Sequence, residues 1–239
     1  MSPARQVASG HTGRARQLER ILEAEFPGQL ANVHGIFLDQ DMSSGTAAFV
    51  DACANMVPPV PAPAGKKCVF VPAALNQQAL RFRQGRATVG GRSRENWHVD
   101  TLQTLVHEIQ HVSFDAAGLG QPAGVAAAAC ARADVEFELS ELAAIMSEFP
   151  VAFRAIPAAA PAGHPARTRL TNWFNHAISN PGESIEGALT KMRCSCDCAE
   201  VDAFVKQTFA FVSASWTVPE KTAFNTVLRD PVRGLHWPL

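Results

Sequence analysis

The sequence contains no tyrosine and carries little net charge. The first shortage limits how an enzyme could be built from this chain, and the second limits the partners it could bind. Without a Tyr hydroxyl, a hydrolase built from this chain must stabilise a developing oxyanion with a His, an Arg or a backbone N–H. The formal net charge of −1 excludes a nucleic-acid binder that depends on bulk positive charge. No apolar run reaches the ~18 residues of a membrane-spanning helix, so we predict no membrane span.

The N-terminus, "MSPARQVASGHTGRARQLER", also lacks the apolar core of a secretory signal. We therefore expect a chain that is cytoplasmic, that is exported by a route without such a signal, or that is a piece of a longer protein.

Cysteine, by contrast, is plentiful, with six residues in the chain. Cys194, Cys196 and Cys198 stand together in "RCSCDCAE". Their one-residue spacing is tighter than the about two to four residues usual in a structural zinc half-site. Disulfides or free thiols are therefore favoured over a second zinc ion, and the sequence leaves open which of them forms.

Hydrophobic patterns predict a mixture of helices and strands in the first part of the chain. An amphipathic helix is expected over 13–26, a strand over 31–41 and a second helix over 45–57. A buried strand over 66–72 and a weaker strand over 86–91 follow.

The later part of the chain is predicted to be mainly helical. The helices are expected over 123–149, 168–178, 183–193, 199–213 and 218–228. Two Pro/Ala-rich stretches, 57–65 and 156–166, are predicted to be loops or lobe boundaries. The fold class is therefore α+β. We expect an N-terminal lobe over 1–155 and a helical lobe over 156–239, which together form one catalytic unit.

The stretch "WHVDTLQTLVHEIQHVSFD" predicts a helix with chemistry on one side. Asp100 and Gln103 suit a helix start, and the helix can continue to Gly118 or Gly120. A single apolar stripe runs along it at spacings of three and four, formed by Leu102, Leu105, Val106, Ile109 and Val112. His107 and His111 lie one turn apart on the flank of this stripe.

Two imidazoles one helical turn apart can hold one Zn²⁺ at ~2.0–2.1 Å. Glu108, one residue after His107, can then reach a water on the metal without being a ligand. We expect it to take the proton of that water and pass it to the leaving amine. The plain alternative is a helix on the flank of the core that carries two surface histidines.

The "VHEIQH" segment in this helical context resembles the zincin superfamily of metallopeptidases. The resemblance implies a zincin-like core, with a small sheet and an active-site helix, one catalytic Zn²⁺, and a protein or peptide substrate. The third His of metzincins is missing after His111, where "VSFDAAGLGQ" follows. A glutamate from a later helix is therefore expected as third ligand, as in glutamate zincins.

Glu141 and Glu138 in "ELSELAA" are the two candidates for that ligand. In glutamate zincins a small residue commonly stands three positions after the ligand, and Ala144 meets this for Glu141, whereas Glu141 itself follows Glu138. We favour Glu141, with Glu138 as an outer partner that orients a ligand His or lies on the rim. The resemblance also favours His176 as a possible oxyanion stabiliser and "RATVGG" as a substrate-pairing edge strand.

Over the whole chain, the sequence is similar to metallopeptidase domains of bacterial contact-delivered toxins, such as effectors of type VI secretion systems. That resemblance implies delivery by a secretion-machinery carrier into the periplasm or cytoplasm of a target cell, and an immunity protein as partner. Two alternatives stay open. One is a zinc hydrolase that acts on cell-wall peptides, and the other is an interaction or delivery domain without catalysis.

Overall fold

The strands of the first part of the chain form a small sheet around one central strand. The computed structural model describes residues 5–6, 14–39, 42, 48–53, 56–57, 62–89, 91–119, 132–180, 183–233 and 235–239. In the three-stranded sheet, β5 (Lys67–Pro72) lies between β2 (Val33–Asp39) and β3 (Phe49–Ala52). β2 pairs with β5 in parallel, and β3 pairs with it antiparallel.

The central strand is buried because it is covered on both sides. Its residues Cys68 to Val71 have no exposed surface, which matches the continuous apolar run that predicted it. Phe49 of β3 stacks on Phe70 of β5, with 5.0 Å between the ring centroids. A disulfide joins Cys53, just after β3, to Cys68 of β5. The sheet is therefore held by packing, by its ladder and by a covalent bond.

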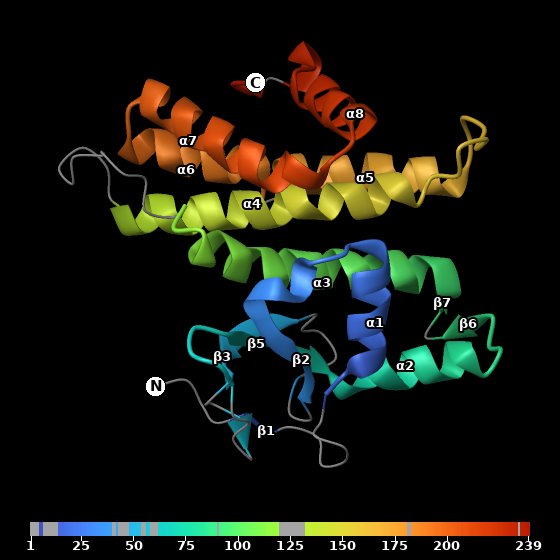
Figure 1. Ribbon diagram of the computed structural model, residues 1–239. Helices are drawn as coiled ribbons and strands as arrows, with labels where there is room; N and C mark the ends of the chain where they lie inside the picture. The colour runs from blue at the N-terminus through green and yellow to red at the C-terminus, as the bar shows by residue number, and fades with distance from the viewer. Residues whose placement is uncertain are drawn as a thin grey trace. The chain divides into compact units, whose positions relative to one another are not determined.

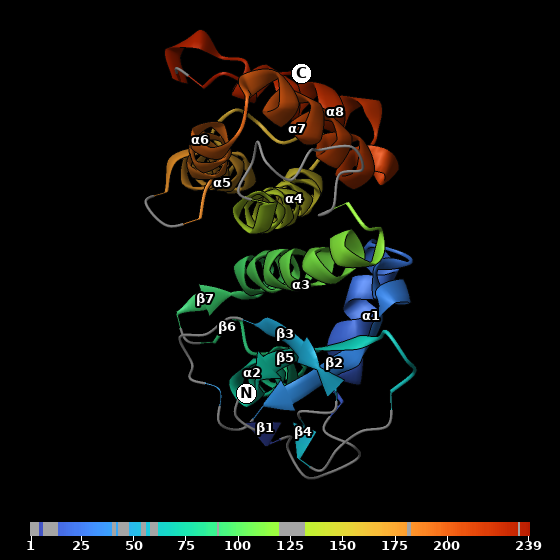
Figure 2. The ribbon, with the colours of Figure 1, turned by 90° about the vertical axis from the view of Figure 1, so that its left-hand side faces the viewer.

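Two short helices flank this sheet (Figure 2). They are α1 (Arg16–Glu25), which contacts β2, and α2 (Ala73–Arg83), which contacts β2 and β5. The carboxylate of Glu19 on α1 accepts hydrogen bonds from Arg14 at 2.7 Å and from the backbone N–H of Ile36 at 2.9 Å. A side chain at Gly35 would meet this pair, since its Cβ would lie 2.8 Å from Glu19 Oε1. A larger residue at this position would therefore have to displace the ends of these two side chains.

The structure tests the helices and strands that were predicted for the first part of the chain. The helix over 13–26 and the strands over 31–41 and 66–72 are confirmed by α1, β2 and β5. The helix over 45–57 is wrong, because its described residues form β3 and the short β4 (Met56–Val57). Pairing with β5 and the disulfide override the helical preference of its alanines.

Several short elements complete this part. A two-residue strand, β1 (Arg5–Gln6), pairs in parallel with β4, and a 3₁₀ helix covers Gln29–Asn32. The strands β6 (Thr88–Val89) and β7 (Arg92–Ser93) form a small antiparallel hairpin just before the long helix α3 (Arg94–Ala116). Figure 2 shows α3 beside the three-stranded sheet. The helix α2 was not predicted, although "AALNQQALRFR" is rich in strong helix formers.

The later part of the chain is helical, as predicted. Its elements are α4 (Arg132–Arg154), α5 (Pro165–Ser179), α6 (Ile185–Ser195), α7 (Cys198–Val212), α8 (Val218–Leu228) and two 3₁₀ turns, Ser213–Ser215 and Pro231–Arg233. α5, α6 and α7 pack against α4, which runs along them in Figure 1. The residues 123–131 of one predicted helix lie outside the described ones.

An aromatic cluster holds these helices together. Phe149 of α4 is fully buried at its centre. Its ring centroid lies 5.1 to 5.8 Å from those of Phe153, Trp173, Phe174, Trp216 and Phe224. These rings come from α4, α5, α8 and the segment before α8, so this cluster is the centre of the helical core.

The chain is thus α+β and mostly helical, with eight α-helices among the described residues. It divides into two compact units, Met1–Ser113 and Phe114–Leu239, whereas the sequence predicted a lobe boundary after residue 155. Within the described residues, no helix has both the length and the apolar character needed to cross a membrane.

Candidate metal centre

The helix that carries the HExxH residues begins earlier than predicted. Asp100 was expected to cap it, but α3 starts at Arg94. The hydroxyl of Ser93 accepts a hydrogen bond from the backbone N–H of Asn96 at 3.2 Å, the arrangement of an N-terminal cap. Asp100 therefore lies within the helix, where its carboxylate accepts a hydrogen bond from Arg92 at 3.2 Å.

The predicted apolar stripe of α3 is confirmed. Each of its members is at most 3% exposed, and they are Leu102, Leu105, Val106, Ile109 and Val112. Because this stripe fixes the rotation of the helix, His107 and His111 fall on its flank, where both are half-buried. Their ring centroids are 5.1 Å apart and the rings are nearly perpendicular, at 77°. Glu108, also half-buried, follows His107.

The helix α4 supplies the carboxylate. Glu141 is 8% exposed, and the small residues Ala143 and Ala144 beside it have no exposed surface. A carboxylate buried to this extent is costly unless a cation or hydrogen-bond donors compensate its charge. Glu141 therefore does not lie on a solvated face of α4.

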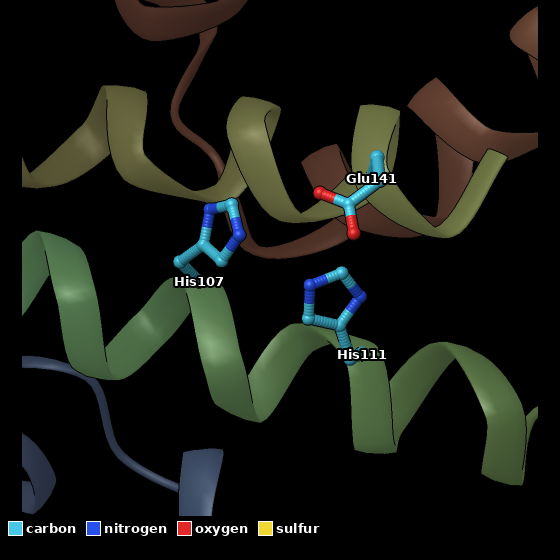
Figure 3. A group of neighbouring side chains, drawn as sticks. All are labelled: His107, His111 and Glu141. Atoms are coloured by element: carbon cyan, nitrogen blue, oxygen red, sulfur yellow. The ribbon is translucent and has the colours of Figure 1, made fainter. Parts of the chain in front are cut away.

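His107, His111 and Glu141 form the one candidate metal-binding group found among the described residues. Each offers one ligand atom, and these atoms all lie within 4.8 Å of one another. Figure 3 shows the two imidazoles of α3 and the carboxylate of α4 directed toward one another. Two neutral nitrogens and one carboxylate oxygen suit Zn²⁺ and match the ligand set of catalytic zinc sites, which keep a fourth position open. The residues present therefore fit one zinc ion.

Glu138, the other predicted candidate for third ligand, lies outside this group. Its carboxylate accepts a hydrogen bond from Lys191 of α6 at 2.7 Å. Lys191 could not be predicted as this partner, because it is 53 positions away from Glu138 and no local pattern connects the two.

Two other histidines are also outside the group. His176, the predicted oxyanion stabiliser, lies on the exposed side of α5, whereas Trp173, Phe174 and Ala177 form the buried side of that helix. His98, which precedes the HExxH residues on α3, pairs with Glu25 of α1. Neither residue belongs to the metal-binding group, and the oxyanion role of His176 stays a prediction.

The substrate-pairing strand predicted at "RATVGG" is reduced to β6, a two-residue strand whose one described neighbour is β7. A short strand thus precedes α3, as expected, and its pairing with a substrate stays a prediction.

The cysteines take no part in the candidate group. Besides the bond between Cys53 and Cys68, Cys196 is disulfide-bonded, and Cys194 and Cys198 are exposed free thiols. Among the part of the chain that the structure describes, no group of metal ligands includes a cysteine. Both predicted outcomes for "RCSCDCAE", a disulfide and free thiols, therefore occur side by side.

Comparison of the chain with protein families, with curated proteins and with solved structures finds no match.

Proposed function

We propose that this protein is a zinc-dependent endopeptidase with a zincin-like core. His107, His111 and Glu141 bind one catalytic Zn²⁺, and Glu108 is the general base and acid. The observation that carries the proposal is the convergence of these three ligand atoms within 4.8 Å of one another. The glutamate comes from a helix 30 residues further along the chain than His111 (141 − 111 = 30), so this convergence does not follow from the HExxH spacing alone.

When bound, the zinc ion supplies Lewis acidity, which polarises a peptide carbonyl and lowers the pKa of a water molecule. Glu108 lies one residue after a ligand and one turn before the other, and it is half-buried. It accepts the proton of the attacking water and then delivers it to the leaving amine. The buried stripe of α3 sets the direction of His107 and His111, and the packing of α4 sets that of Glu141.

Glu108→Gln tests the function directly. The variant keeps the size of the side chain but removes the base, so we expect it to retain one zinc per chain and to lose about 10²- to 10⁴-fold in the cleavage rate of an unfolded protein such as labelled casein. Zinc content by atomic emission and cleavage by fluorescence are the two measurements. The metal-site proposal fails if the wild-type chain binds no zinc, and the role of Glu108 fails if the variant cleaves at the wild-type rate.

The proposed setting is delivery into a target cell as an effector toxin, countered by an immunity protein in the producing cell. The disulfide between Cys53 and Cys68 and the disulfide-bonded Cys196 support exposure to an oxidising compartment. The same pair of chains tests it, since wild type expressed in the periplasm of a bacterium should arrest growth and Glu108→Gln should not. Equal growth with both chains, in the periplasm and in the cytoplasm, would contradict the toxin role.

A further inference from the structure

The carboxylate of Glu138 is held by a lysine from another helix of the same unit. Lys191 of α6 donates a hydrogen bond to Glu138 Oε1 at 2.7 Å, and α6 packs against α4. Glu138 is 7% exposed, whereas the side chain of Lys191 is 56% exposed. The lysine thus reaches from the surface to a carboxylate that is otherwise costly to bury.

The charge of the proposed ligand Glu141 also acts on Lys191. The hydrogen bond with Glu138 raises the pKa of Lys191 most; burial opposes the rise, and the charges of Glu138, Glu141 and Glu183 add to it. The ammonium group therefore stays protonated among three carboxylates, two of them on α4.

Glu138 and Glu141 are neighbours on the surface of α4. They are three positions apart on α4, a spacing that puts the Cβ atoms of two helical residues ~5–6 Å apart. Glu138 is thus a second carboxylate of α4 beside the proposed ligand. In the structure it does not lie in the metal-binding group, and it is bound to Lys191 instead.

We propose that Lys191 is a positioning residue, which holds Glu138 out of the coordination sphere so that Glu141 is the one carboxylate ligand from α4. The proposal rests on the proposed zinc peptidase function. A catalytic zinc site has three protein ligands and an open position, whereas four protein ligands make a closed, structural site. By holding Glu138, Lys191 keeps that fourth position open for water and substrate.

Lys191→Met tests this role, because the proposal predicts that zinc affinity rises in this variant. Once released, Glu138 joins as a fourth ligand, so we expect the full chain to bind Zn²⁺ more tightly than wild type and to cleave protein more slowly. A lysine that only stabilises the helices would give the opposite sign, because a loosened α4 weakens zinc binding. Zinc affinity is measured at neutral pH by competition with a chromophoric chelator.

A second measurement tests directly whether the fourth coordination position is open, and it does not depend on catalytic activity. Acetohydroxamic acid, a small metal-binding molecule, should change the visible spectrum of the Co²⁺-substituted wild-type chain. It should change that of Lys191→Met little, because Glu138 occupies the position it needs. Lys191→Gln is a milder variant for the same two measurements if Lys191→Met does not fold.

Two control variants isolate the pair. Lys191→Arg keeps the charge and the donor and should behave as wild type. The double variant Lys191→Met/Glu138→Gln removes the competing carboxylate and should restore both the zinc affinity and the response to hydroxamate.

Unchanged or weaker zinc binding by Lys191→Met, or a hydroxamate response retained by that variant, would overturn this inference, and the same holds for Lys191→Gln where it replaces Lys191→Met. The proposed function would survive that result, provided that wild type binds zinc and Glu108→Gln is inactive. A wild-type chain without zinc would remove both.

Discussion

The two helices that carry the candidate ligands have the same length and opposite environments. α3 and α4 each contain 23 residues. α3 buries one stripe, and His107, Glu108 and His111 lie half-buried on its flank. α4 is buried nearly all round, with every residue from Leu139 to Phe149 buried except the half-buried Ser140 and Glu148.

This difference in burial shows whether the histidines of α3 or the glutamates of α4 are the better sign of a functional site. A half-buried histidine on a one-sided helix costs little, because water can satisfy its ring, so its position alone does not show a function. A buried carboxylate on an apolar helix is costly, and its charge must be compensated. For Glu138 that compensation comes from Lys191. Glu141 is as buried as Glu138, but its carboxylate belongs to the group with the two histidines. The buried glutamate of this group is therefore more informative about the site than the half-buried histidines.

The largest expected effect separates the two glutamates of α4. Loss of an outer partner typically costs about 10- to 100-fold in metal affinity, and loss of a ligand costs more, so Glu141→Gln should be left without zinc after dialysis. Glu138→Gln is the matched control on the same helix and should keep its zinc. Zinc content per chain checks both variants, and the reverse pattern would move the ligand role to Glu138.

The next effect tests whether α4 owes its stability to packing. Phe149 is fully buried among five aromatic rings, so Phe149→Ala should lower the free energy of unfolding by about 3–5 kcal/mol. Phe137 of the same helix is 56% exposed, and Phe137→Ala should change it by no more than about 0.5 kcal/mol. Denaturant titration measures both. Equal losses would show that the aromatic cluster is not the centre of the core.

The same contrast explains what could be predicted from the sequence. The α3 stripe and its two histidines have a strict period of three and four, so the helix and its polar flank were predicted correctly. The choice of Glu141 over Glu138 came from a small residue three positions on, and the structure indeed groups Glu141 with the histidines. The helices α5 to α8 were predicted near their observed bounds because each begins or ends at a Pro, Ser, Thr or Asp signal.

The errors came from interactions that a local pattern does not contain. Residues 45–57 are rich in alanine, but the pairing of β3 with β5 and the bond between Cys53 and Cys68 decide the conformation of their described part. The partner of Glu138 could not be predicted for the same reason, since Lys191 belongs to a different helix. The start of α3 was misplaced because two cap-like residues, Ser93 and Asp100, compete in the same stretch, and composition does not rank them.

The smallest expected effect concerns that helix start. Ser93→Ala removes the acceptor of the Asn96 N–H and should cost about 1 kcal/mol of folding free energy. Asp100→Ala instead removes an ion pair with Arg92 whose side chains are 43% and 62% exposed, and it should cost about 0.5 kcal/mol or less. Thermal unfolding of the two variants ranks them. A larger loss for Asp100→Ala would restore Asp100 as the cap and would shorten α3 by its first turns. If the order holds, a single surface cap adds to α3 a fraction of what Phe149 contributes to α4. The helix that presents the histidines would then be fixed chiefly by its apolar stripe, and the stripe would set the direction of both imidazoles.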